Sequence, residues 1–120
     1  MRPHEKLDVW GRAVDLVVDI YRATDNFPKE EKFGLTSQLR RAAVSVPANI
    51  AEGAARKSCK EFLHFLSNAQ GSASEIETEL LIASRLGFLG EREYVKLRAS
   101  LDEIGRMLTG LSHHLGRRLE

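Results

Sequence analysis

The sequence predicts an all-α protein, an antiparallel up-and-down four-helix bundle formed by a single domain over residues 1–120. In four stretches apolar residues recur every three or four positions, which is the spacing of one helix face. The three segments between them are rich in turn-forming residues and short enough to join antiparallel helices. A chain of 120 residues can also bury a core without disulfides. We expect helices over about 7–25, 35–56, 59–86 and 91–117.

The first predicted helix, 7–25, has an unusually broad apolar face, with Asp8 as a plausible cap. Two neighbouring stripes form this face: Leu7, Trp10, Val14, Val17 and Tyr21 in one, and Val9, Ala13, Leu16 and Ile20 in the other. A helix in an isolated four-helix bundle needs only a narrower seam. The extra width suggests that this helix also covers a neighbouring surface.

The second predicted helix, 35–56, contains Pro47 in its middle. Proline lacks an amide donor and its ring presses on the carbonyl of Ala43, so we expect a kink there. The apolar stripe is Leu35, Leu39, Ala42, Val46 and Ile50, and most of the neighbouring residues are small. A kinked, smooth helix suits an interface.

The third and fourth predicted helices, 59–86 and 91–117, have the most regular spacing. Ser58 and Glu61 match a capping box at the start of the third helix, and Gly87 suits the left-handed residue that ends it. Their apolar stripes are Phe62, Leu66, Ala69, Ala73, Ile76, Leu80 and Ala83, and Tyr94, Leu97, Leu101, Ile104, Leu108, Leu111 and Leu115. Alternating steps of three and four are typical of helices packed side by side.

Composition limits the class of protein. Hydrophobic residues make up 42% and charged residues 29% of the chain, so we expect a soluble globular protein. The amino terminus has no apolar signal-peptide stretch and no segment approaches the ~20 apolar residues of a membrane span, which predicts a cytoplasmic protein without a membrane partner. A lone cysteine, Cys59, fits a reducing compartment.

The net charge is only +1, but the charges are unevenly distributed. Five basic residues and one acidic residue lie between Leu35 and Lys60, whereas four acidic residues and one basic residue lie between Glu61 and Gly87. Two segments of opposite sign can pack together and pair their charges, which we favour. The alternative is an exposed stripe that binds phosphates.

The sequence indicates no catalytic, metal or cofactor site, and no small-molecule substrate. A di-iron bundle needs two Glu-x-x-His pairs, and only Glu61 and His64 form one. The adjacent His113 and His114 would point apart. Glycine-rich phosphate loops and nucleophile elbows are missing, and the small residues around Gly71 favour close helix packing over ligand binding.

The polar residues of the second helix allow two interpretations. In the structural one, which we prefer, Asn49 caps groups freed by Pro47, and Arg40 or Arg41 forms an ion pair within the bundle or between subunits. The candidate acidic partners are Glu52, Glu75 and Glu79. In the functional one, five cations contact phosphates: Arg40, Arg41, Arg56, Lys57 and Lys60.

The run GLTSQLRRAAVSVPANIAEG, from Gly34 to Gly53, resembles the signature of the 23S ribosomal RNA intervening-sequence proteins. The resemblance extends over nearly the whole chain, through Arg56, Glu61-Phe62, Phe65-Leu66, Gly71-Ser72, Glu75, Glu79 and Leu86-Gly87. It implies an up-and-down bundle that assembles as a homopentameric ring in bacteria. The biochemical role of that family is generally unassigned.

These observations lead to two hypotheses of function. The first is a non-enzymatic, homo-oligomeric helical bundle that binds structured RNA related to ribosomal RNA. The second is a protein–protein interaction scaffold whose basic residues are occupied by salt bridges. Salt-dependent RNA affinity distinguishes the two.

Overall fold

The computed structural model describes residues 1–119 and contains four α-helices and no strand in that range. The helices are α1 (Asp8–Thr24), α2 (Leu35–Ala54), α3 (Cys59–Arg85) and α4 (Glu91–Arg117). Two short 3-10 helices, η1 (Pro3–Lys6) and η2 (Lys29–Glu31), precede α1 and α2. The predicted all-α class is confirmed.

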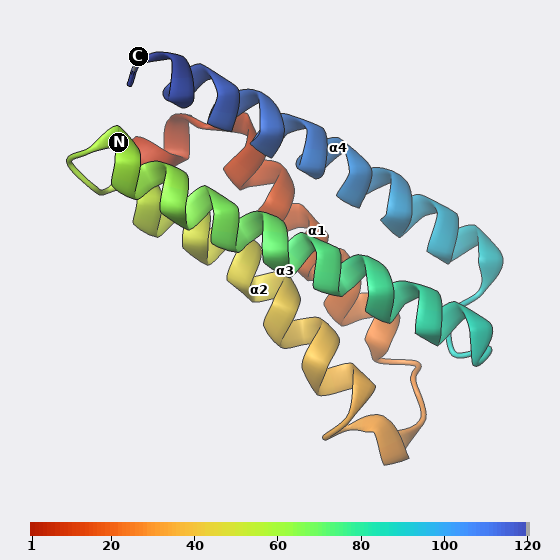
Figure 1. Cartoon of the computed structure of the whole chain (residues 1–120). Coiled ribbons are helices and arrows are strands. Elements are labelled where there is room, and N and C mark those ends of the chain that lie inside the picture. Colours follow the sequence, from red (N-terminus) through yellow and green to blue (C-terminus); the bar gives the residue numbers. More distant parts are fainter. Residues whose placement is uncertain (120) are drawn as a thin grey trace.

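Each helix packs against the next one in the sequence, and α4 also packs against α1. Among the described residues the diagonal pairs, α1 with α3 and α2 with α4, have no Cα atoms within 8 Å of each other. The result is an up-and-down bundle of 47 × 21 × 21 Å (Figure 1). The helix η1, the last turn of α4 and the α2–α3 connection lie at the same end of its long axis (Figure 1).

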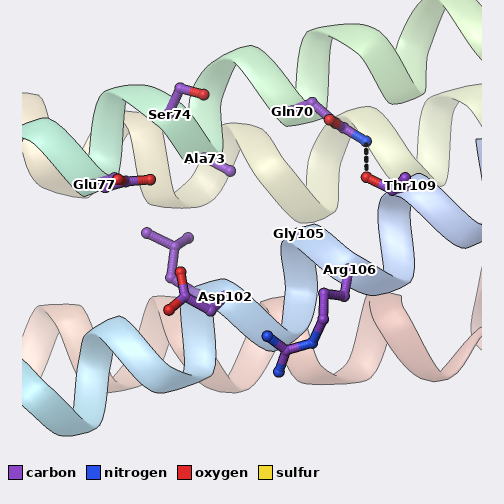
Figure 2. A pocket seen from close by; sticks show the side chains of 9 residues that line it. Gln70, Ala73, Ser74, Glu77, Asp102, Gly105, Arg106 and Thr109 are labelled. Carbon is purple, nitrogen blue, oxygen red and sulfur yellow. Dashed lines mark hydrogen bonds between the residues drawn. The ribbon is translucent and has the colours of Figure 1, made fainter.

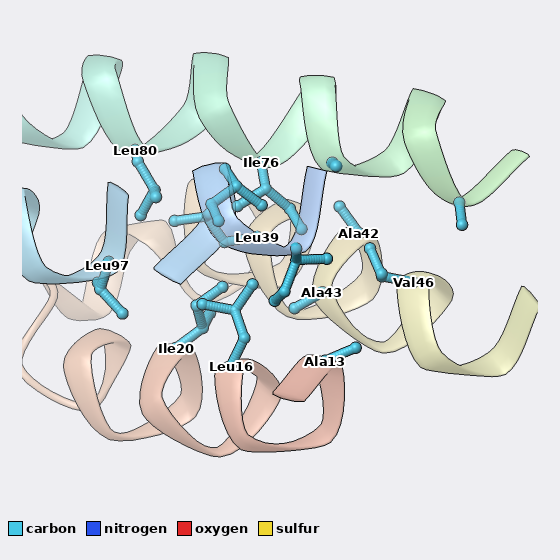
Figure 3. Packing of buried hydrophobic residues seen from close by; sticks show 14 of the residues in the cluster. Ala13, Leu16, Ile20, Leu39, Ala42, Ala43, Val46, Ile76, Leu80 and Leu97 are labelled. Atoms are coloured by element: carbon cyan, nitrogen blue, oxygen red, sulfur yellow. The ribbon is translucent and has the colours of Figure 1, made fainter. Parts of the chain in front are cut away.

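The core lies along the bundle axis and takes its side chains from all four helices (Figure 3). Helix α1 contributes only one of its two apolar stripes, the one that contains Leu16 and Ile20. The stripe that contains Val17 and Tyr21 stays partly exposed at the side of the bundle. One chain therefore buries about half of the broad apolar face of α1.

Helix α2 continues through Pro47 without interruption, and the Pro47 ring is buried. The predicted kink is not confirmed. Small residues nevertheless bring α2 close to α3: a Cβ atom on Gly53 would lie 2.8 Å from the Phe65 Cβ and 2.9 Å from the Phe62 Cδ1. Real Cβ atoms do not approach so closely, so this crossing of α2 and α3 requires glycine.

Local signals set the ends of the helices. The Ser58 hydroxyl accepts a bond from the Glu61 amide at 3.1 Å, which is the serine half of the predicted capping box. Gly87 ends α3 with φ +79°, and the Phe88 amide donates to the Ala83 carbonyl at 2.9 Å, as in a Schellman motif. The prediction for Asp8 was wrong: Leu7 holds the cap position and Asp8 is the first helical residue.

Candidate nucleic-acid interface

Arg40 is held by contacts within the chain. Its guanidinium donates to the Thr24 hydroxyl at 2.8 Å, the Tyr21 carbonyl at 3.2 Å and the Asp25 carboxylate at 3.0 Å. It also covers the Tyr21 ring, with its central carbon 4.5 Å from the ring centroid. Arg40 therefore joins α1 to α2, and its ionic partner is Asp25 instead of the glutamates that the sequence suggested.

Arg41 lies on the other side of α2, in a polar groove between α2 and α3 that also includes Glu75. Both side chains are exposed, and among residues 1–119 neither forms an ion pair. The Ser72 hydroxyl donates to the Ser45 hydroxyl at 2.8 Å and links the two helices along this groove. Of the two arginines, Arg41 is thus the one that is free to bind a partner.

Asn49 extends this polar seam. Its amide donates to the carbonyl of Ser45 at 2.8 Å and to the Ser45 hydroxyl at 2.9 Å. It does not cap the Ala43 carbonyl, which is the group that Pro47 leaves without a helical donor. The predicted role of Asn49 at the proline was therefore wrong, and Asn49 instead orients Ser45 toward α3.

Arg56, Lys57 and Lys60 are exposed at the α2–α3 connection. Arg56 pairs with Glu52 at 2.9 Å and lies 4.9 Å from the Phe65 ring centroid. Lys57 and Lys60 have no acidic partner among the described residues. Of the five predicted cations, these three are close together in the chain, whereas Arg40 and Arg41 face opposite sides of α2.

The fold adds further cations to this end of the molecule. The helix η1 and the last turn of α4 lie at the same end of the bundle as the α2–α3 connection (Figure 1). We define the basic end as residues 2–6, 52–61 and 113–118, which carry seven Lys or Arg and three Glu. The opposite end, residues 25–32 and 85–93, carries four Lys or Arg and five Asp or Glu. The predicted phosphate contacts did not include Arg2, Lys6, Arg117 or Arg118. Only the directions of the helices in the fold bring these residues to the same end as the α2–α3 connection.

Glu79 is the one buried charged residue among those described, with 5% of its surface exposed. It belongs to α3, and its Oε1 atom has no hydrogen-bond partner. Burial, and then the neighbouring Glu75, raise the pKa of Glu79 from 4.5 to about 7. The suggested ion pair with Arg40 or Arg41 does not form within the described chain.

A second groove runs between α3 and α4 (Figure 2). The Gln70 amide donates to the Thr109 hydroxyl at 3.2 Å at one end of it. Its carboxylates, Glu77 and Asp102, are both paired with Arg98, at 3.0 and 3.5 Å. The rest of the lining is Ala73, Ser74, Leu101, Gly105 and Arg106, so the polar groups that cross the groove serve to join α3 to α4.

The histidine positions agree with a surface role. His64 is exposed, and its ring meets Phe65 edge-on at 5.5 Å. His113 and His114 are exposed near the end of α4.

Within residues 1–119, no helix combines the length and the apolar character that a membrane span needs.

The fold and these surfaces define a class: a four-helix bundle with one basic end, one buried glutamate and two polar grooves, one on each side of α3. Residues 5–110 match the family model of the 23S rRNA-intervening sequence protein. The chain belongs to this family.

A solved structure shares the fold. It is a protein of unknown function from the S23 ribosomal protein family of Bacteroides thetaiotaomicron, 24% identical, and the match covers 87% of this chain and 97% of that one with a TM-score of 0.79. Among proteins with curated functions, none matches the chain.

Proposed function

We propose that this protein is a non-enzymatic helical module that assembles with copies of itself and binds structured RNA through its basic end. The observation that carries the proposal is the excess of cations on residues 2–6, 52–61 and 113–118. Phosphate backbones bind such surfaces by releasing counterions, and this requires no enclosed pocket. The family description refers to 23S rRNA, which makes RNA the polyanion to test first.

Self-assembly strengthens a surface of this kind. The basic end of a single bundle has only a small excess of positive charge, seven Lys or Arg against three Glu, and Arg56 already has an acidic partner. Several copies in one assembly would present the same patch repeatedly, and linked weak contacts add through effective concentration. The half-exposed apolar stripe on α1 supports assembly, because single chains rarely leave such stripes uncovered.

A protein scaffold is the second candidate. The ion pairs of Arg40 with Asp25 and of Arg56 with Glu52 favour it, since they occupy two of the five predicted phosphate contacts. In this case the protein assembles with copies of itself or other proteins and binds RNA no better than its low net charge allows.

The test is the affinity for an RNA hairpin, measured by fluorescence anisotropy at several salt concentrations. We expect log affinity to fall linearly with log salt, and Lys57→Glu/Lys60→Glu to lower both the affinity and the slope. The control is Lys29→Glu/Arg92→Glu, which changes the net charge equally at the opposite end. Equal losses in the two variants would mean that only net charge matters and would favour the scaffold.

A further inference from the structure

An apolar groove runs along the side of the bundle between α1 and α2. Its apolar lining consists of Val17, Val18, Tyr21 and Val44. Val18 and Val44 are each 43% exposed and Tyr21 is 41% exposed, although all three belong to well-formed helices. Arg22, Asp25 and Arg40 form its polar rim. A groove of this composition fits an apolar side chain with a charged neighbour.

Phe33 is the most exposed aromatic residue among those described, with 87% of its surface exposed. It lies between η2 and α2, and it borders the polar groove between α2 and α3, together with Arg41 and Glu75. The Lys32 ammonium lies 5.4 Å from its ring centroid, but no part of the core covers the ring. An aromatic side chain held outside the core costs the chain hydrophobic stabilisation, and burial in a partner recovers it.

These two features open on different sides of α2. The apolar groove contains Val44 on the side toward α1, whereas the groove beside Phe33 contains Arg41 on the side toward α3. A protruding residue and a receiving groove at different places on one surface are the elements of a head-to-tail contact. Repeated by rotation, such a contact closes into a ring.

Each feature has charges of both signs: Asp25 and Arg40 also border the apolar groove, and Lys32 and Arg41 also lie beside Phe33. The two charges that can pair across the contact are Arg22, on the rim of the groove, and Glu75, beside Phe33. Both are exposed, and within residues 1–119 neither forms an ion pair. A contact that places Phe33 of one copy in the groove of the next can bring Arg22 and Glu75 together as an ion pair, which favours this orientation.

We propose that Phe33 of one copy inserts into the Val18–Tyr21–Val44 groove of a second copy, and that this head-to-tail contact builds the assembly. The inference rests on the self-assembly part of the proposed function and specifies the surfaces that meet. The two faces differ from each other, so every copy uses one of each, and a single interface type suffices for a closed ring.

The test uses two variants that each remove one half of the contact. Phe33→Glu removes the inserted side chain, and Val44→Glu places a charge in the groove. Each variant alone should be monomeric by light scattering, whereas an equimolar mixture should form a heterodimer of twice the 13.5 kDa chain mass, because one intact half remains on each partner. Val95→Glu on α4, at a residue that is 58% exposed, is the control and should assemble like the wild type.

The outcomes separate the two proposals. A monomeric wild-type protein overturns both self-assembly and this contact. A wild-type oligomer whose Phe33→Glu and Val44→Glu variants remain assembled overturns this contact alone. Two monomeric variants that do not combine when mixed show that the two surfaces do not bind each other, and also overturn it. Circular dichroism of each variant confirms that the helices are intact.

Discussion

The Nε–H of Arg40 donates to the hydroxyl oxygen of Thr24 at 2.8 Å, across the interface between α2 and the last turn of α1. The Thr24 side chain is buried, and its own proton is donated to the Ile20 carbonyl at 2.8 Å. Arg40 thus satisfies the acceptor side of a hydroxyl that water does not reach. The ion pair with Asp25 is more accessible to water, since the Asp25 side chain is 74% exposed against 27% for Arg40, so the bond to Thr24 carries most of the stabilisation.

Replacing Arg40 should therefore weaken the fold. We expect Arg40→Ala to lower the free energy of unfolding by about 1–3 kcal/mol, since it leaves a buried polar atom without a donor and uncovers Tyr21. The neighbouring Arg41→Ala is the control and should change it by about 0.5 kcal/mol or less, because Arg41 is exposed and unpaired. Urea unfolding at one fixed protein concentration measures both, and equal losses would contradict the assignment.

Glu79 makes stability depend on pH. Its pKa is about 7 in the folded chain against 4.5 ordinarily, so between these values the folded state binds more protons than the unfolded state. Stability should therefore fall as pH rises from 4.5 to 7, by up to about 3 kcal/mol, and change little from this group above or below that range. Glu79→Gln should flatten this part of the profile and raise the melting temperature at pH 8. Glu93→Gln, at an exposed residue, should leave the profile unchanged.

Two helix glycines should respond oppositely to alanine. Gly53→Ala should destabilise the protein by about 1–3 kcal/mol, because the new Cβ meets backbone-anchored atoms of Phe65 and Phe62. Gly71→Ala should stabilise it by about 0.5–1 kcal/mol, because nothing lies within 4 Å of the new atom and alanine is the better helix former. Thermal unfolding followed by circular dichroism compares them. Changes of the same sign would argue against the close approach of α2 and α3 at Gly53.

The sequence predicts the fold well because the period of apolar residues directly reflects burial. Leu39, Val46, Ile76 and Leu108, each on a predicted stripe, are buried in the core. This spacing could not show which of the two apolar stripes of α1 is buried in the core, because both stripes have it. The structure buries the stripe with Ile20, since only packing against α2 and α4 decides which face turns inward.

The candidate site was harder to predict because its contacts join distant parts of the chain. Arg40 bonds to residues of the preceding helix, and no local spacing relates it to Thr24. The prediction that Gly71 permits close helix packing was also wrong. Gly71 is exposed, and its neighbour Ser72 forms the contact with α2. The spacing of apolar residues assigns a charged residue such as Glu79 to the surface, so it did not predict that Glu79 is buried.

The unequal charge of the two bundle ends has a geometric consequence for any ring built from side contacts. The proposed contact joins the long sides of neighbouring bundles, and rotation about one axis keeps every copy pointing the same way. All the basic ends then lie on one face of a disc, and all the opposite ends, with their nearly balanced charges, on the other. Such a disc is two-sided: an RNA strand can lie across several copies on one face, while the reverse face, which has almost no net charge, attracts it less and stays open to a different partner.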